Sequence, residues 1–170
     1  MQTPPEHPEV ESFWADAKIR AKLNVATGYF GPNPHDAMTP PAWSFGGTPA
    51  QADALLDLVL AGRKTATASA LWDYEASGEP VPQRGQLSIV LDGQGRPAAL
   101  IVTTAVRVVP FDEVDEEHAA AEGEGDGSLA AWRRAHERFF SEHADHDRGF
   151  APDMPVVLEA FRVLHRAAGA

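Results

Sequence analysis

Residues 48–72 read TPAQADALLDLVLAGRKTATASALW and predict a capped helix that leads through a basic turn into a Thr-rich strand. Thr48 and Gln51 have the spacing of a capping box at the helix start. Apolar residues recur at helical spacing as far as Gly62, which is suited to end the helix in a left-handed turn. From Lys64 onward, small and β-branched residues alternate, which favours a strand. The most reactive side chains therefore fall between two regular elements, and this turn is the candidate site.

The Gly-x-Lys-Thr sequence at residues 62–65 does not match a phosphate-binding loop of the Walker type. That loop requires Gly-x-x-x-x-Gly-Lys-Ser/Thr followed by a helix, whereas here a helix precedes the lysine and a strand follows it. Because Lys64 lies just beyond a helix C-terminus, its charge also complements the helix dipole. A structural and a functional interpretation of this lysine therefore both stay open.

The composition indicates one globular domain. The chain has 170 residues, of which 44% are apolar, and this is enough for one sizeable core. It contains no cysteine, which excludes disulfide and thiolate chemistry and is compatible with a reducing compartment. The sequence shows neither a signal peptide nor a run of 18 apolar residues, so we expect a cytoplasmic protein that does not enter a membrane.

The net charge of −11 restricts the possible partners. Binding to long nucleic acid draws most of its strength from cations that displace phosphate counterions, so we expect no binding to double-stranded DNA. A small substrate, or a short single strand held by a local basic patch, is easier to accommodate.

The remaining segments predict an α+β fold with antiparallel strands. Residues 86–92 and 98–109 flank an Asp-Gly-Gln-Gly turn and predict a hairpin. Residues 156–165 predict a last strand. Together with a strand at residues 65–72, these segments would form one curved, largely antiparallel sheet against which helix 48–61 packs. We expect a small barrel with helices packed at its ends.

An extension precedes this core. Residues 8–24 carry one apolar stripe and predict a packing helix. Residues 28–47 contain four prolines and several aromatic residues and predict an irregular loop. In that loop, Trp43 and Phe45 either line the entrance of a site or anchor the loop on the core. Residues 72–84 are polar, with one glycine and two prolines, and predict a connection without regular structure.

Two helices are predicted between the long strand and the last one. Residues 111–122 begin with acidic side chains, and the four-residue spacing of His118 and Glu122 lets these two side chains touch. That contact is either a surface pair or part of a site. Ser128 is suited to cap the next helix, which extends to about residue 143.

The helix after Ser128 carries a local cluster of basic side chains, comprising Arg133, Arg134, His136 and Arg138. In so acidic a protein, these arginines could hold a phosphate group. The alternative is a solvated helix face, with Trp132 and Phe139 buried on the other side.

No metal site is predicted. Glu122 and the residues after it match several positions of a calcium loop, but the twelfth position is Arg133, where a bidentate Glu is required. Residues 143–147, HADHD, are of metal-ligand types, but no helix or strand orders them, so we interpret them as a loop. We therefore expect neither a metal nor another cofactor.

These motifs together resemble the ASCH domain family, the activating-signal-cointegrator homology group of the PUA-like superfamily. The similar parts are Phe45-Gly46 before a capped helix, GRKTAT at residues 62–67, the strand GQLSIVLD at 85–92, and the pair of segments FDEV and AEGEGDGSL within 111–129. The resemblance covers about residues 45–165. It implies a PUA-like β-barrel with packed helices, and a single domain over residues 1–170 in which residues 1–44 are an N-terminal extension.

The resemblance also implies a catalytic site. Family proteins act on RNA or nucleosides, and some are amidohydrolases that remove acyl groups from N4-acylcytidine. In that branch a Lys, a Thr three residues later and a Glu on the following helix are catalytic, which correspond here to Lys64, Thr67 and Glu122. Either Glu122 accepts a proton while Lys64 stabilises an oxyanion, or the two groups share one proton.

Longer family members described as nucleases implicate a Lys at the position of Lys64 and a Ser in the segment of Ser128. Three functions therefore stay open: a nucleoside amidohydrolase, a ribonuclease or single-strand RNA binder, and a non-catalytic module that binds a modified base. The residues expected to contact the substrate are Arg63, Ser128, Arg133, Arg134, Trp43 and Phe45. The expected partner is a modified nucleoside or a short single-stranded RNA.

Overall fold

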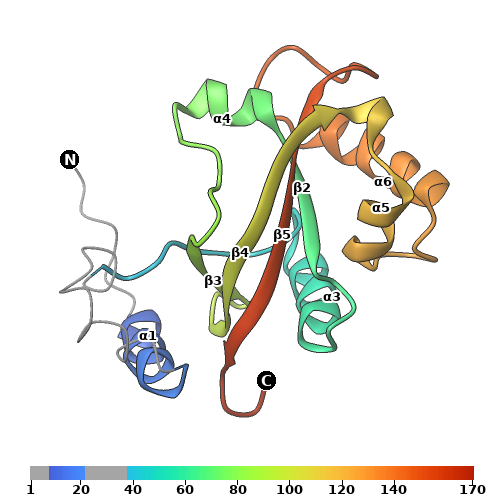
Figure 1. The fold of residues 1–170 in the computed structure, drawn as a ribbon. Coiled ribbons are helices and arrows are strands. Elements are labelled where there is room, and N and C mark those ends of the chain that lie inside the picture. Colours follow the sequence, from blue (N-terminus) through green and yellow to red (C-terminus); the bar gives the residue numbers. More distant parts are fainter. Residues whose placement is uncertain (1–7, 22–37) are drawn as a thin grey trace. The chain divides into compact units, whose positions relative to one another are not determined.

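The structure is a computed structural model that describes residues 8–21 and 38–170 (Figure 1). Helices and strands are mixed along the chain, which confirms the α+β class. The elements are α1 (Pro8–Arg20), β1 (Ala42–Trp43), α3 (Pro49–Leu60), β2 (Ala66–Ala70), α4 (Leu71–Ser77), β3 (Leu87–Leu91), β4 (Pro97–Pro110), η3 (Phe111–Glu113), α5 (Glu116–Glu122), α6 (Leu129–Glu142) and β5 (Pro155–Arg166). None of the described helices has the length and apolarity needed to cross a membrane.

The strands form one five-stranded sheet in the order β1-β3-β4-β5-β2. β3 pairs antiparallel with β4, and β2 pairs antiparallel with β5, as the sequence predicts. The short strand β1 pairs parallel with β3 and was not predicted. The four predicted strands all occur, and their ends differ from the predicted ones by one or two residues.

The chain divides into two compact units, and the division falls within α3, β4 and β5. Unit 1 contains residues up to Leu56 together with 87–102 and 163–170, and unit 2 contains 57–86 and 103–162. In unit 1, the apolar stripe of α1 packs Phe13 and Trp14 with Ile89 of β3 and Leu100 of β4. The sequence predicted this packing helix.

Unit 2 has a core of its own, built where α5, α6 and β2 meet. In Figure 1, α5 lies next to α6. Within this unit α5 contacts both α6 and β2, and α4 contacts β2. Phe111 and Trp132 are buried with ring centroids 5.3 Å apart. Phe140 and Met154 complete the same apolar cluster. Removal of this aromatic surface from water is the main force that holds the two helices in place.

The expectation of an irregular connection at residues 72–84 was wrong in its first part. Residues 71–77 form α4, which ends at Gly78 in the left-handed conformation with φ of 72°. No side chain caps the start of this helix, and it has only seven residues. Without a cap or an apolar period, so short a helix leaves almost no signal in the sequence.

Two other expectations need correction, and two more extend beyond the described residues. Residues 111–122 form two helices rather than one, because the Asp115 side chain accepts from the His118 N–H and starts α5 anew. The side chain of Phe139 is 36% exposed rather than buried. The predicted N-terminal helix ends at Arg20, and its last predicted residues, 22–24, lie outside the described ones. Of the predicted loop at 28–47, residues 28–37 also lie outside them.

The end of α5 packs directly against the turn that carries Lys64. The Thr65 N–H donates to the Ala121 carbonyl oxygen at 2.8 Å. Gly123, which follows α5, has φ of +67°, and a Cβ placed there would lie 2.7 Å from the Arg63 carbonyl carbon. Only a residue without a side chain allows this close approach of the two backbones.

We expect Gly123→Ala to destabilise the protein more than Gly125→Ala. Both glycines have positive φ, but a Cβ at Gly125 would meet nothing within 4 Å. The left-handed backbone alone costs alanine about 1–2 kcal/mol, and the clash with Arg63 adds roughly 1–3 kcal/mol. Urea unfolding of the two variants measures the difference. Equal free energies of unfolding would show that the contact between α5 and the turn is not tight.

Candidate functional site

Lys64 is buried in unit 2. The residue is only 2% exposed, and its backbone N–H donates to the Leu58 carbonyl oxygen in a turn that closes the end of α3. The Nζ donates to Oε1 of Glu124 at 2.7 Å and to Oε2 of Glu122 at 3.4 Å. The turn therefore directs the ammonium inward, where burial of its charge requires the two carboxylates.

Glu122 is a buried carboxylate surrounded by donors. Its Oε1 accepts from the Trp132 Nε1–H at 2.9 Å and from His118 Nε2 at 2.7 Å. Its Oε2 forms ion pairs with His136 Nε2 at 3.2 Å and with Lys64 Nζ at 3.4 Å. The predicted contact between His118 and Glu122 is present, in the protein interior rather than at the surface.

The surroundings of Glu122 decide its protonation state. Burial alone would raise its pKa, but the hydrogen bonds from His118 and His136 and the positive charges of His136 and Lys64 outweigh that effect. The pKa of Glu122 is therefore held well below its ordinary value of 4.5. This carboxylate is ionised at neutral pH and is a weak base.

His136 has the complementary shift. Burial alone would lower its pKa, but the hydrogen bond to Glu122 and the negative charges of Glu122 and Glu124 raise the pKa above the ordinary 6.5. Its Nδ1 donates to the Trp132 carbonyl oxygen at 2.9 Å, and its ring stacks on Trp132 at 4.1 Å. Both ring nitrogens therefore face acceptors, which favours the imidazolium form.

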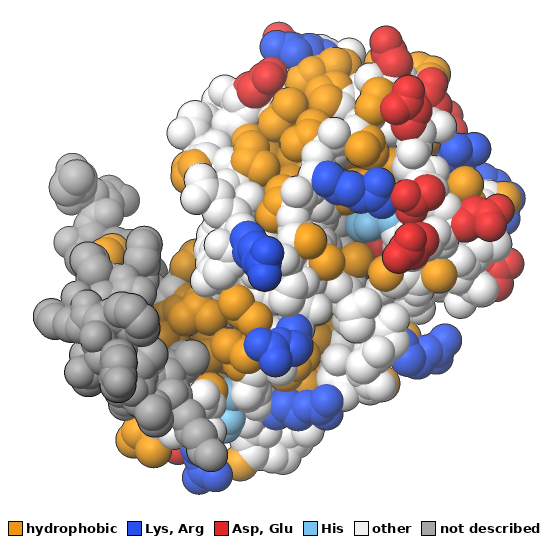
Figure 2. All heavy atoms as spheres, viewed as in Figure 1, with side chains coloured by type: hydrophobic (Ala, Val, Ile, Leu, Met, Phe, Trp, Pro, Cys, Tyr) orange, Lys and Arg blue, Asp and Glu red, His pale blue; other side chains and the backbone are white. Residues whose placement is uncertain are grey.

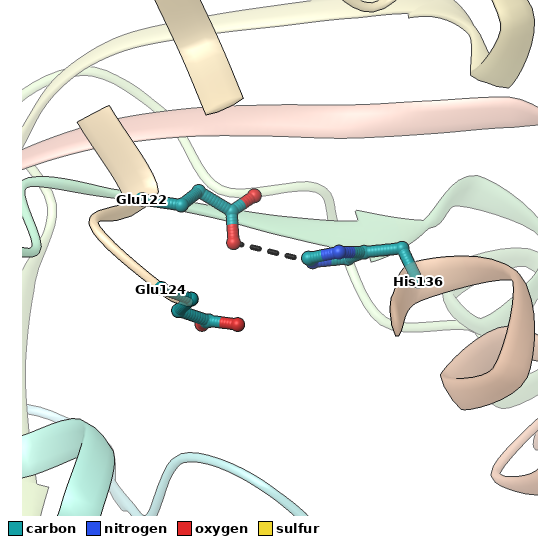
Figure 3. A group of neighbouring side chains, drawn as sticks. All are labelled: Glu122, Glu124 and His136. Atoms are coloured by element: carbon teal, nitrogen blue, oxygen red, sulfur yellow. Dashed lines mark ion pairs between the residues drawn. The ribbon is translucent and has the colours of Figure 1, made fainter. Parts of the chain in front are cut away.

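The side chains of Glu122, Glu124 and His136 converge from the end of α5, the segment after it and α6 (Figure 3). One ligand atom from each lies within 4.8 Å of the others, a spacing that suits a metal ion. However, the Lys64 ammonium already contacts both carboxylates, and an imidazolium is not a ligand. A metal ion would have to displace the ammonium and the His136 proton.

Thr67 lies on β2 directly opposite Glu159 of β5. Alternation along the strand places it on the face opposite Ala68 and Ala70, which pack against the helical core of unit 2. Within the described residues, Thr67 is not among the groups that form a hydrogen bond or ion pair with Glu122. The structure therefore brings Lys64 and Glu122 together and places Thr67 beside another carboxyl group.

That carboxyl group, Glu159, is buried and accepts a hydrogen bond from Thr103 Oγ1 at 2.6 Å. Burial raises the pKa of Glu159 above its ordinary 4.5, although the Thr103 hydrogen bond acts in the opposite direction. Close by on the same face as Thr67, the Ser69 hydroxyl shares a hydrogen bond with the Tyr74 hydroxyl at 2.9 Å. This face of β2 thus has a polar cluster that includes Thr67, Ser69 and the paired Glu159.

Some of the residues of unit 2 that were expected to bind the substrate make structural hydrogen bonds instead. Ser128 caps α6 by accepting from the Ala131 N–H, as the sequence predicts, and an Arg133 guanidinium N–H donates to the Asp112 carbonyl oxygen. Arg63 and Arg134 are exposed. Figure 2 shows acidic side chains gathered among the basic ones over α5 and α6, and they weaken the local positive charge.

Trp43 and Phe45 lie in unit 1, where their rings meet edge to face at 4.8 Å. Phe45 is 6% exposed and is thus an interior side chain of that unit, whereas Trp43 is half-buried. Their contact with a substrate stays a prediction.

Sequence reasoning missed Glu124, Trp132 and His136 as members of the site. Glu124 was considered only as a calcium ligand, and Trp132 and His136 only as parts of a helix with a buried and a basic side. Their four-residue spacing does place Trp132 and His136 on one helix face, but nothing in the sequence indicates that this face meets Glu122.

The strand order and the packed helices define a PUA-like fold, as the sequence resemblance implied. The chain belongs to the ASCH domain family, whose model matches residues 41–165. Proteins of this family are in general associated with RNA.

Two solved structures are similar over most of the chain. The ASCH domain from Lactobacillus crispatus JV V101 is 30% identical with a TM-score of 0.79, and the match covers 96% of this chain and 99% of that one. A protein from Enterococcus faecalis V583 is 36% identical with a TM-score of 0.70, and the match covers 88% of both chains. No curated protein matches the sequence.

We expect the charged network to stabilise the protein most between pH 4.5 and 6.5, the ordinary pKa values of Glu and His. The pKa of Glu122 is lowered, so its contribution is complete above 4.5 and is lost as the pH falls. The pKa of His136 is raised, so its contribution is complete below 6.5 and is lost as the pH rises through the folded-state value.

His136→Gln should therefore lower the free energy of unfolding by about 3 kcal/mol near pH 5.5, and by less above pH 8. The exposed His143 provides a matched control, since His143→Gln should change little at any pH. Urea unfolding at several pH values measures both. A His136→Gln deficit that does not vary with pH would contradict the assigned charges.

Proposed function

We propose that this protein hydrolyses the amide of an N4-acylcytidine-type nucleoside at the Lys64 centre. The observation that carries the proposal is the buried Lys64 ammonium, which two carboxylates share. One of them, Glu122, is inaccessible, but the Glu124 side chain is 30% exposed. Two further points support the choice of substrate. The chain has the Lys, Thr and Glu residue types of the amidohydrolase branch, and the family is in general associated with RNA.

Lys64 would stabilise the charge that develops on the acyl oxygen. Attack on an amide carbonyl places negative charge on its oxygen, and a buried ammonium stabilises such a charge strongly. Movement of the partly exposed Glu124 carboxylate would free one ammonium N–H for the substrate. Of the two roles that the sequence left open for Glu122, the lowered pKa favours that of charge partner for Lys64 over that of base.

Thr67 is the nucleophile that the amidohydrolase branch implies, and it can act here only if the substrate reaches from the Lys64 ammonium to the face of β2 that carries Thr67. Its Oγ would attack the acyl carbon, the C–N bond would break, and the cytidine amine would leave with a proton. Water would then hydrolyse the acyl ester and release the carboxylic acid. Glu159, the cross-strand neighbour of Thr67, is a carboxyl group that could accept the hydroxyl proton. A water molecule activated by Glu124 is the competing nucleophile.

We expect the wild-type protein to release cytidine from one or more members of a panel of N4-acylcytidines, measured by chromatography. Lys64→Met should lower kcat by about 10²–10³, the usual cost of one oxyanion donor. Since this change also removes the ammonium from the buried Glu122 and the partly exposed Glu124, Lys64→Arg and unfolding curves separate a catalytic loss from a folding defect. Glu124→Gln should retain the fold and alter both kcat and KM.

Thr67→Val tests the nucleophile, because it removes the hydroxyl and keeps the shape. The exposed Thr104 offers the matched control Thr104→Val, which should not affect turnover. Full activity of Thr67→Val would assign the attack to water. If the wild type binds acylcytidines and releases no product from any of them, the protein is a binding module rather than a hydrolase.

A second function, binding of short single-stranded RNA, is favoured by the exposed guanidinium groups of Arg134 and Arg138 on α6. We expect Arg134→Glu to weaken binding of a labelled oligonucleotide and to make log K less steep in log salt by about 0.7 for each lost phosphate contact. Arg84→Glu, at an exposed position elsewhere in unit 2, makes the same change in net charge. If the two variants weaken binding of the oligonucleotide equally, the change in net charge explains the loss and Arg134 makes no specific contact with RNA.

A further inference from the structure

Unit 2 has a hollow that the proposed reaction does not use. Its volume is 530 Å³, and it is lined by Trp72, Glu75 and Ala76 of α4 and by residues 144–148, the loop after α6. This volume is within the range of pockets that hold small ligands. Residues 144–147 of this loop belong to the HADHD sequence at 143–147, which was predicted to be a loop without a function.

His146 lines this hollow and has an unsatisfied donor. Its side chain is 3% exposed, and its Nδ1 accepts from the Arg148 N–H at 3.1 Å, so the ring proton of the neutral form is on Nε2. Within the described residues, this Nε2 has no hydrogen-bond partner. The Asp73 Oδ1 is 3.7 Å away, too far for a hydrogen bond, and accepts instead from the Asp145 N–H. A buried donor in this state indicates a missing acceptor.

An aromatic ring and a guanidinium group lie beside that donor. The ring of Trp72 meets the His146 ring edge to face at 5.2 Å, and the Arg148 guanidinium carbon lies over Trp72 at 5.0 Å. Arg148 is held at its tip by one ion pair of 3.4 Å with Glu75, and both side chains are about half exposed. Because such an exposed ion pair is weak, the Arg148 guanidinium can move away from the Trp72 ring and make room for a flat group between them.

We propose that this hollow is a nucleobase-binding subsite. The base stacks between the ring of Trp72 and the guanidinium plane of Arg148, as bases of single strands do on aromatic and arginine side chains. Once the surrounding side chains shift, a ring nitrogen or carbonyl oxygen of the base accepts the His146 Nε2–H, which protein atoms cover in this structure, and satisfies the donor.

The carboxylates around the hollow indicate which bases fit. Glu75, Asp145 and Asp147 line it and can accept hydrogen bonds from an exocyclic amino group. Uracil has no such group, so cytosine and the amino-bearing purines are the expected ligands. The subsite does not depend on amide hydrolysis at Lys64, and it would serve a hydrolase and an RNA binder alike.

The test uses the full chain labelled with 5-fluorotryptophan, with cytidine monophosphate as the probe and fluorine NMR as the readout. The chain has four tryptophans, and the spectrum of Trp72→Phe assigns the Trp72 resonance. Cytidine monophosphate should shift that resonance, uridine monophosphate should bind more weakly, and ribose 5-phosphate should not shift it. An equal shift with ribose 5-phosphate would show that the base is not recognised and would overturn the proposal.

Calorimetric titration of variants with cytidine monophosphate tests the individual contacts. Trp72→Ala should weaken binding about tenfold or more, the usual effect of losing a stacking ring. His146→Asn keeps an acceptor close to the Nδ1 position and removes the Nε2 donor, and it should weaken binding about fivefold. Phe139→Ala, at an exposed aromatic residue of the same unit, is the control and should leave binding unchanged.

Lys64→Arg and Lys64→Met separate this proposal from the proposed function. Either variant should retain binding of cytidine monophosphate even where turnover of acylcytidines is lost. If binding is lost with the Lys64 variants and unaffected by Trp72→Ala and His146→Asn in proteins with normal unfolding curves, the base binds at the Lys64 centre and the hollow is not a subsite.

Discussion

Glu122 is an ionised carboxylate in the interior of unit 2 that contacts four donor groups on three separate segments. Lys64 comes from the turn after α3, His118 from α5 itself, and Trp132 and His136 from α6. The cost of burying the charge is offset only while all of these groups are in place. The Glu122 side chain therefore links α5, α6 and the turn to one another, in addition to the apolar cluster that holds the two helices together.

This arrangement constrains any chemistry at Lys64. The positive charges of Lys64 and His136 balance the negative charges of Glu122 and Glu124, so the centre has no excess charge to attract a polyanion. Its partly exposed member, Glu124, is the group whose movement would make the ammonium accessible. The same network thus stabilises the fold and limits access to the Lys64 ammonium, so substitutions in it would alter stability together with any chemistry at Lys64.

Much of the fold was predictable because its signals are local. Capping by Thr48 and Ser128, the turn at Gly62 and the hairpin of β3 and β4 depend on residues a few positions apart. The contact of His118 with Glu122 follows from helical spacing alone. By contrast, α4 lacks a capping side chain and β1 has two residues, so neither leaves a periodic pattern.

The sequence by itself determined which residues have reactive side chains and which of them lie next to one another along a single element. Only the tertiary structure decided that Glu124 and His136 share a centre with Lys64, because that centre exists only where α6 packs against α5. It likewise placed Thr67 opposite Glu159, a residue more than ninety positions away in the chain. Strand pairing and helix packing bring together residues from distant segments, and no local pattern specifies which distant residues meet.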